Sequence, residues 1–135
     1  MPASPPELIT EVTVRSADVD KMGVARPEQY FGWFARSMDA FLEARGWSGD
    51  LQRELAVSLP VVESYLRLRL PAGYKEILAI EPSPLSLESH RFCLSYQVIR
   101  SSDGAHLADG RTVHACQSPE GGRRRLPAPL LAALG

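Results

Sequence analysis

Hydrophobic and polar positions repeat with two different periods along this chain, and the change of period divides it into predicted elements. Leu8 to Arg15 alternates apolar and polar residues, which predicts a strand with one buried face. From Pro27 to Gly46 the apolar residues recur at helical spacing, which predicts one helix of about four to five turns. Because this helix is apolar around much of its girth, we expect other structure to enclose it. A shorter helix is predicted over Asp50 to Ala56.

The second half of the chain has the twofold period of strands. Four strands are predicted, at residues 61–70, 77–88, 92–98 and 106–117, and a short helix is predicted within 126–134. Pro82 and Pro84 predict a bulge or a sheet edge in the second of these strands. One strand, a long helix and four strands joined by hairpins predict an α+β fold, an antiparallel sheet around a central helix. The 135 residues are expected to form a single domain, 1–135.

Composition excludes several classes of function. The formal net charge is -1 and charged residues make up 23%, so no overall field would attract nucleic acid or an anionic membrane. Cys93 and Cys116 have neither a disulfide context nor metal-ligand spacing, and two buried, reduced thiols are expected. No secretion signal is seen in Met1 to Glu7 and no apolar run approaches membrane-spanning length, so the expected location is the cytoplasm.

The strongest chemical signal is the loop that precedes the long helix. Asp18, Asp20 and Gly23 come shortly before Pro27, which suits the first helical position because its missing N–H would have no acceptor there. An acid beside the positive end of a helix dipole suits an enzyme that attacks a carbonyl and stabilises an oxyanion. The alternative is that both acids only shape a turn that caps the helix.

This loop resembles a known family. Asp18-Val19-Asp20-Lys21-Met22-Gly23-Val24, with Tyr30 and Trp33 behind it, is similar to the D-x-D-x-x-G-[VI]-x(5)-Y-x-x-W segment of hotdog-fold acyl-CoA thioesterases of the 4-hydroxybenzoyl-CoA thioesterase type. The stretch from Leu66 through Pro71-Ala72-Gly73-Tyr74 to Ile80, and Gly110-Arg111-Thr112, resemble later segments of that family.

The resemblance implies a hotdog fold, a five-stranded antiparallel sheet wrapped around the long helix, in a homodimer or homotetramer. It implies an acyl-CoA or acyl-carrier-protein thioester as substrate, CoA as part of that substrate, and no other cofactor or metal. Asp20 would act as nucleophile or general base, alternatives that the sequence leaves open. Asp18 would bond nearby backbone N–H groups, and Gly23, Val24 and Tyr30 would lie against the substrate.

Pro27 departs from the family pattern where the chemistry is most sensitive. The resemblance implies that the backbone N–H at this position polarises the thioester carbonyl, and proline has none. The amides of Glu28 and Gln29 are therefore the predicted oxyanion donors, with Pro27 itself against the substrate. Pro27 leaves three alternatives open: slow hydrolysis, a different pose of the thioester, or a non-catalytic acyl-CoA-binding protein.

Further candidates come with simpler alternatives. Glu63 and Ser64 open a strand that would run beside the acyl pocket and could orient water, or they are solvated strand residues. His90, Arg91, Arg123 and Arg124 could hold CoA phosphates, or the arginines belong to a solvated turn. His106 and His114 are expected to be structural or surface residues. Hydration of a thioester in this fold would need a His a few residues after the acid, and none follows Asp20.

Overall fold

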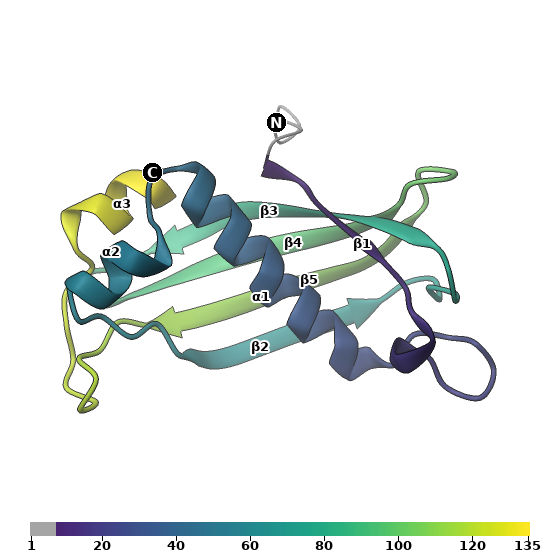
Figure 1. The fold of residues 1–135 in the computed structure, drawn as a ribbon, viewed down its shortest axis with the longest axis horizontal. Coiled ribbons are helices and arrows are strands. Elements are labelled where there is room, and N and C mark those ends of the chain that lie inside the picture. Colours follow the sequence, from purple (N-terminus) through teal and green to yellow (C-terminus); the bar gives the residue numbers. More distant parts are fainter. Residues whose placement is uncertain (1–7) are drawn as a thin grey trace.

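The computed structural model describes residues 8–135, so the expectations that concern residues 1–7 lie outside it. Five strands form one antiparallel sheet in the order β1-β3-β4-β5-β2, and the long helix α1 lies across one face of it (Figure 1). The predicted α+β architecture is therefore confirmed. The elements are β1 (Thr10–Thr13), a 3-10 turn (Ser16–Asp18), α1 (Pro27–Ala44), α2 (Gly49–Glu54), β2 (Val61–Leu68), β3 (Ile77–Leu87), β4 (Arg91–Arg100), β5 (His106–Ala115) and α3 (Ala128–Leu134).

Helix α1 begins at Pro27, as the sequence predicts, and ends before Gly46. Gly46 has a φ of 98°, a left-handed conformation that glycine adopts without strain at a helix end. The face toward the sheet buries Tyr30, Trp33, Phe34, Ser37, Phe41 and Leu42. The expectation that other structure encloses this helix is wrong within one chain, because residues such as Gly32, Ala35 and Arg36 leave the opposite face exposed.

The link between β2 and β3 is not the hairpin that the sequence predicts. β2 pairs with β5 at one edge of the sheet, whereas β3 pairs with β1 and β4 near the other edge. Residues 72–75 take their backbone partners from the acidic loop and from the end of β1: the Ala25 N–H donates to the Ala72 carbonyl at 2.8 Å, and the Lys75 N–H to the Val14 carbonyl at 2.9 Å. These bonds carry the chain across the molecule instead of back along β2.

The prolines of β3 have the predicted effect. β1 covers only the Ile77–Ile80 half of β3, so the half that contains Pro82 and Pro84 has β4 as its strand partner and lies at the sheet edge. The register between β3 and β4 also shifts between Pro84 and Ser86. Both predicted features, a bulge and an edge, therefore occur in this strand.

The centre of the core is a close contact between α1 and the sheet. The Phe34 ring stacks on the Tyr96 ring of β4, with 4.5 Å between centroids and 11° between planes. Gly110 of β5 faces the same ring, and a Cβ placed there would lie 2.3 Å from Phe34 carbons. The absence of a side chain at Gly110 therefore sets how closely α1 approaches the sheet.

Gly110→Ala should destabilise the fold by about 1–3 kcal/mol, because the added methyl group must displace a fully buried aromatic ring. Denaturant unfolding followed by circular dichroism measures this. Gly32→Ala is the matched control, since a Cβ at this helical position meets nothing within 4 Å and should stabilise by about 0.5–1 kcal/mol. Equal effects of the two substitutions would contradict this description of the core.

Strand β2 forms the other edge of the sheet and exposes apolar residues. Val61, Val62, Tyr65 and Leu68 are each 43–52% exposed. The side of β2 away from β5 has no strand partner among the described residues (Figure 1). An uncovered strand with exposed apolar side chains is a typical place for a further strand to add.

Candidate active site

Asp18 shapes the loop before α1. Its side chain is buried, and Oδ2 accepts the Arg15 backbone N–H at 2.8 Å. Its carbonyl accepts the Arg26 N–H at 2.9 Å, which joins the two ends of the loop. The predicted role of Asp18, a carboxylate bonded to nearby backbone N–H groups, is confirmed.

Asp20 is exposed at the turn of the same loop. Its Oδ1 accepts backbone N–H groups from Met22 at 2.9 Å and from Val24 at 3.0 Å. The two bonds, that from Val24 first, hold the pKa of the Asp20 carboxyl below its ordinary value of 3.8. Oδ2 makes no hydrogen bond within the described part of the chain, so an ionised oxygen faces solvent.

Asp20 stabilises its own turn and does not cap α1. The N-cap residue of α1 is Arg26, which provides no side-chain hydrogen bond to the helix start. Asp20 is nonetheless brought to this helix end, because the loop closes through a Val19–Ala25 bridge and the bond from the Arg26 N–H to Asp18. In Asp20, therefore, Oδ1 holds the turn through its hydrogen bonds, whereas Oδ2 is free to take part in a reaction.

If Asp20 must be ionised for activity, its low pKa predicts a rate that is insensitive to mild acid. A carboxyl with a pKa below 3.8 stays ionised as the pH falls from 7 to 5, so kcat/KM should be flat there and fall only below about pH 4. Hydrolysis assays in a constant-ionic-strength buffer series measure this. An acid limb with a midpoint near pH 6 would instead indicate that a histidine controls the rate.

The start of α1 offers fewer free amides than the sequence predicts. The Gln29 N–H already donates to the Arg26 carbonyl at 3.0 Å, and Pro27 has no N–H. The Glu28 N–H has no acceptor among the described residues. The two predicted oxyanion donors therefore differ, and Glu28 is the one whose amide is available.

The other candidates near this loop lie in two different surroundings. The Gly23 carbonyl accepts the Tyr74 N–H at 3.1 Å, and Val24 forms a bridge with Gly73, so both line the junction of the loop with the link to β3. Tyr30 is 1% exposed and packs on Trp33 at 4.8 Å between ring centroids, so its ring belongs to the core below the helix start.

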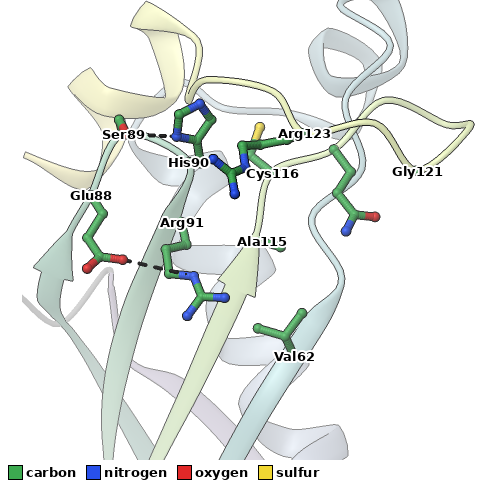
Figure 2. A pocket seen from close by; sticks show the side chains of 10 residues that line it. Val62, Glu88, Ser89, His90, Arg91, Ala115, Cys116, Gly121 and Arg123 are labelled. Atoms are coloured by element: carbon green, nitrogen blue, oxygen red, sulfur yellow. Dashed lines mark hydrogen bonds and ion pairs between the residues drawn. The ribbon is translucent and has the colours of Figure 1, made fainter.

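A hollow of about 590 Å³ lies at the opposite end of the sheet. His90, Arg91 and Arg123, three predicted phosphate-binding residues, line it together (Figure 2). The Ser89 Oγ lies 2.7 Å from His90 Nδ1, and Arg91 lies 3.9 Å from the Glu88 carboxylate and 4.0 Å from that of Glu63. The rest of the lining is Val62, Glu88, Ser89, Ala115, Cys116, Gln117 and Gly121.

Arg124 is not brought to this hollow with Arg123. Its guanidinium donates to the Ala56 carbonyl at 2.9 Å and to the Leu55 carbonyl at 3.3 Å, just after α2. Neighbouring residues in an extended segment point to opposite sides, which explains why two adjacent arginines have different partners. A structural contact thus occupies the Arg124 side chain.

Glu63 and Ser64 lie in the first half of β2 and belong to opposite faces. Ser64 pairs with Thr112, which is buried toward α1, whereas Glu63 pairs with Val113 on the other face. Both are exposed, and they lie nearer to the hollow than to the acidic loop, because β2 begins beside α2 and runs toward the loop end (Figure 1).

A buried polar chain under α1 was not predicted. The His114 Nδ1 lies 3.0 Å from the Leu59 carbonyl, so Nδ1 must donate, and Nε2 then accepts from the Thr112 hydroxyl at 2.9 Å. Thr112 in turn accepts from the Tyr96 hydroxyl at 2.8 Å. Burial lowers the pKa of His114 and raises that of Tyr96, so both rings are neutral at pH 7. His114 is therefore a structural residue, as expected.

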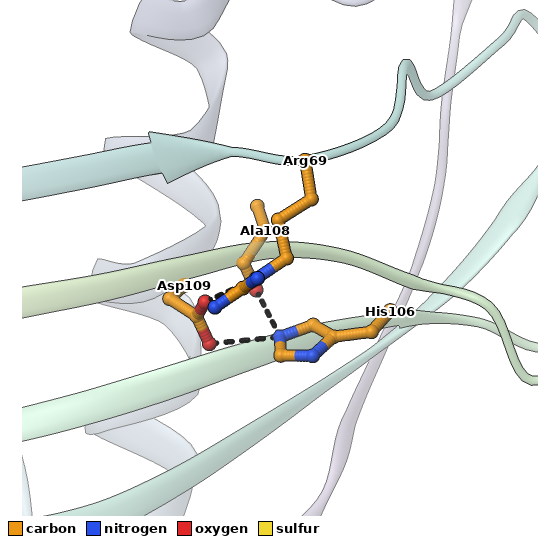
Figure 3. Close-up of polar contacts among 4 residues, drawn as sticks. All are labelled: Arg69, His106, Ala108 and Asp109. Atoms are coloured by element: carbon orange, nitrogen blue, oxygen red, sulfur yellow. Dashed lines mark hydrogen bonds and ion pairs between the residues drawn. The ribbon is translucent and has the colours of Figure 1, made fainter.

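His106 belongs to a second polar group, on the other face of β5 (Figure 3). Its Nε2 lies 2.8 Å from Asp109 Oδ1, and the Arg69 Nε donates to Asp109 Oδ2 at 2.6 Å. Burial opposes ionisation of Asp109, but Arg69 and His106 outweigh it and lower its pKa. Because Arg69 directly follows β2, this group fastens the end of the edge strand to β5.

Three further observations concern the cysteines, metal binding and membrane-spanning helices. Cys93 and Cys116 are both buried and free, as the sequence predicts. Residues 8–135 contain no group of three or more His, Cys, Asp or Glu side chains placed to hold a metal ion. No helix in this described range is both long and apolar enough to cross a membrane.

Comparisons with known proteins agree with this architecture. No curated protein matches the chain. Among solved structures, a 1,4-dihydroxy-2-naphthoyl-CoA thioesterase from Synechocystis is similar at 25% identity, with 93% of each chain covered and a TM-score of 0.85. A hypothetical protein from Thermus thermophilus is 32% identical, with 93% of this chain and 95% of that chain covered and a TM-score of 0.85. A DHNA-CoA thioesterase from Staphylococcus aureus, at 23% identity, covers 87% and 79% of the two chains with a TM-score of 0.82 and supports the fold.

The match to a family model determines the family to which this chain belongs. The model of the thioesterase-like superfamily matches residues 14–134, which include the acidic loop, α1 and all strands except β1. The predictions of a hotdog fold and of a thioesterase are confirmed at this level, whereas the finer 4-hydroxybenzoyl-CoA type stays a prediction. The acidic loop at the start of a sheet-bound helix and the match over almost the whole chain lead to one conclusion: this chain belongs to the thioesterase-like superfamily.

Proposed function

We propose that this protein hydrolyses an acyl-CoA thioester to a free acid and CoA, with Asp20 as the catalytic residue. The observation that supports this most is the ionised, uncommitted Oδ2 of Asp20 in the loop that leads into α1. The Glu28 N–H at that helix start has no acceptor within residues 8–135 and is the donor for the developing oxyanion. In this proposal, Asp20 supplies the attacking or proton-accepting oxygen and the Glu28 amide supplies the oxyanion donor.

Two reaction routes use these groups. In the first, Asp20 Oδ2 attacks the thioester carbonyl, the C–S bond breaks, CoA leaves as a thiolate that takes up a proton, and water hydrolyses the resulting anhydride. In the second, Asp20 accepts a proton from water as the water oxygen attacks the carbonyl, and the thiolate leaves and takes that proton. Both routes consume one water and release one carboxylate, one thiol and one proton.

The hollow at the other end of the sheet is the proposed site for the CoA nucleotide. His90, Arg91 and Arg123 supply donors suited to phosphate oxygens. If Ser89 donates to His90 Nδ1, the His90 Nε2–H is left to donate into the hollow. Such a site favours acyl-CoA over a thioester on a carrier protein, whose single phosphate is joined to a serine.

Arg123→Gln should raise KM for an acyl-CoA by about tenfold, because a charge-assisted hydrogen bond to phosphate is lost. The kcat should change less than twofold, and kcat/KM for the corresponding acyl-pantetheine thioester, which lacks the nucleotide, should be unchanged. Steady-state assays with both thioesters measure this, with Arg53→Gln, an exposed α2 arginine away from the hollow, as the matched control. Equal losses with both thioesters would contradict a nucleotide site.

One subunit alone does not bring the two halves of this site together. The acidic loop and the hollow lie at opposite ends of the sheet (Figure 1). A second copy added antiparallel to the exposed edge of β2 would bring its acidic loop to the hollow of the first, and would cover Val61, Val62, Tyr65 and Leu68. We therefore propose a homodimer with two shared sites, which can further assemble as a homotetramer.

The proposed substrate carries an aromatic acyl group. One of the similar structures is named as a thioesterase of 1,4-dihydroxy-2-naphthoyl-CoA, an aromatic ester, and another as a DHNA-CoA thioesterase. The resemblance to the 4-hydroxybenzoyl-CoA thioesterase type also implies an aromatic acid. An aromatic acyl-CoA is thus the proposed substrate, and the cytoplasm, where CoA esters are made, is the proposed location.

A panel of aromatic and aliphatic acyl-CoA esters tests the function. Release of the CoA thiol, followed with a thiol reagent, should exceed the uncatalysed rate by at least 10⁶-fold for the best ester. The second candidate function, a catalytically weak or inactive acyl-CoA-binding or carrier-protein-binding protein, is favoured by the missing amide at Pro27. Tight binding of esters without their cleavage would support that candidate and exclude the proposed enzyme.

A further inference from the structure

The turn that leads into β3 lies against the acidic loop, at one end of the molecule (Figure 1). The Tyr74 N–H donates to the Gly23 carbonyl at 3.1 Å, and Gly73 forms a bridge with Val24. Val24 contacts Asp20 twice: its N–H donates to Asp20 Oδ1 at 3.0 Å, and its carbonyl accepts the Asp20 N–H at 2.9 Å. The position of this turn is therefore passed on to Asp20 through Val24.

The Glu76 side chain closes this turn. The Gly73 N–H donates to Glu76 Oε1, and the Glu76 N–H donates to the Gly73 carbonyl at 3.1 Å, so the two residues are joined in both directions. The contact is close, because a Cβ placed at Gly73 would lie 3.2 Å from Oε1. Lys75 between them has a φ of 71°, a left-handed conformation that is strained for a residue with a side chain. Such a conformation persists only where the surrounding bonds hold it.

Glu76 is itself fixed by two strands of the sheet. Its other carboxylate oxygen, Oε2, forms an ion pair with the Arg100 Nε at the end of β4, at 3.1 Å. The two side chains are only 28% and 19% exposed, so water screens this pair less than it screens a surface pair. The Glu76 carbonyl accepts the Val14 N–H, just after β1, at 2.9 Å. One carboxylate therefore connects the turn beside the acidic loop with the sheet.

We propose that Glu76 is a positioning residue, which holds Asp20 in its reacting place through the turn and Val24. This inference rests on the proposed function, in which Asp20 is the catalytic residue. Without the Glu76 side chain, the Gly73 N–H loses its acceptor and the strained turn loosens. Asp20 Oδ2 then reaches the thioester, or the attacking water, less often in the right geometry. A displacement of a reacting group by about 1 Å can cost about 10²-fold in rate.

Glu76→Ala should lower kcat by about 10- to 100-fold and change KM less than about twofold, because positioning affects the reaction and not ester binding. Glu76→Gln keeps an oxygen that can accept the Gly73 N–H and should retain at least about a third of the wild-type kcat. Asp103→Asn is the matched control, because Asp103 pairs with the same Arg100 at 3.6 Å while its Oδ1 accepts the Ala105 N–H. Its kcat should equal that of the wild type. Equal losses in Glu76→Ala and Asp103→Asn would overturn the inference.

A second pair of variants separates positioning from a merely structural role. If Glu76 acts through Asp20, Glu76→Ala in the Asp20→Asn background should change the residual kcat less than about twofold. A structural role predicts the same fold loss in both backgrounds and would overturn the inference. Gly73→Ala keeps the Glu76 side chain but presses a methyl group against Oε1, so it should give a smaller loss of kcat that is likewise absent in the Asp20→Asn background.

An NMR titration of the Asp20 carboxyl without substrate tests the positioning independently of turnover. In the wild type, the N–H groups of Val24 and Met22 hold the pKa of Asp20 below 3.8. Glu76→Ala should raise this pKa toward 3.8 and speed hydrogen exchange of the Val24 amide by about tenfold, whereas Asp103→Asn should change neither. Unchanged values in folded Glu76→Ala overturn this inference, even if the protein hydrolyses esters. The expected changes in a protein that cleaves no ester would instead overturn the proposed function and leave Glu76 as the residue that holds Asp20.

Discussion

Asp20→Asn should lower kcat for acyl-CoA hydrolysis by about 10²- to 10⁴-fold, because the amide can neither attack the thioester nor accept a proton from water. The substitution separates chemistry from structure unusually well. The Asn side-chain oxygen can still accept the N–H groups of Met22 and Val24 that now bond to Asp20 Oδ1. The loop should therefore keep its shape, and a purely turn-forming role of Asp20 predicts almost no loss of rate.

Two controls accompany this measurement. Thermal unfolding of Asp20→Asn should stay within a few degrees of the wild type, since the acid is exposed. Asp18→Ala should do the opposite, because it leaves the Arg15 N–H without its acceptor and should cost stability by about 1–3 kcal/mol. If Asp20→Asn retains more than half of the wild-type kcat, Asp20 is not the catalytic residue.

Pro27→Ala should raise kcat by about tenfold or more, because it adds a backbone N–H at the helix start, where the family resemblance places the oxyanion donor. Loss of a single oxyanion donor typically costs 10²- to 10³-fold, and the proposed donor in the wild-type protein is the free Glu28 amide instead. Stability should fall slightly, by about 0.4–1 kcal/mol, because the proline restricts the unfolded chain. Steady-state kinetics on the best ester of the panel measure the gain.

Pro129→Ala is the matched control, because Pro129 occupies the same part of α3 that Pro27 occupies in α1. It should lower stability by a similar amount and leave kcat unchanged. An unchanged kcat in Pro27→Ala would show that the Glu28 amide already serves the oxyanion fully, and a lower kcat would show that the rigid proline positions the helix start.

The sequence predicts local features well because their causes are local. The start of α1 follows from the fixed φ and missing N–H of Pro27, and its end follows from the left-handed conformation of Gly46. The order of strands is different. The place of β2 at an edge depends on bonds between residues 72–75 and a loop about fifty residues earlier, and no periodicity within β2 specifies them.

The candidate site likewise has one part that the sequence predicts and other parts that only the fold brings together. The acidic loop was predictable because Asp18, Asp20 and Gly23 lie close together in sequence, whereas the hollow joins the start of β4 to residues that follow β5. Arg123 and Arg124 are adjacent and equivalent in the sequence, but the fold gives them different surroundings. Arg123 lines the hollow, whereas Arg124 donates to the Ala56 carbonyl.

In the proposed homodimer, one thioesterase site combines Asp20 of one subunit with the Arg123 hollow of the other. Co-expression of an Asp20→Asn subunit with an Arg123→Gln subunit, each with its own affinity tag, yields heterodimers with one intact site and one doubly impaired site. At ester concentrations well below KM, these heterodimers should recover about half of the wild-type kcat/KM. A value no higher than the mean of the two variant homodimers would contradict the shared site.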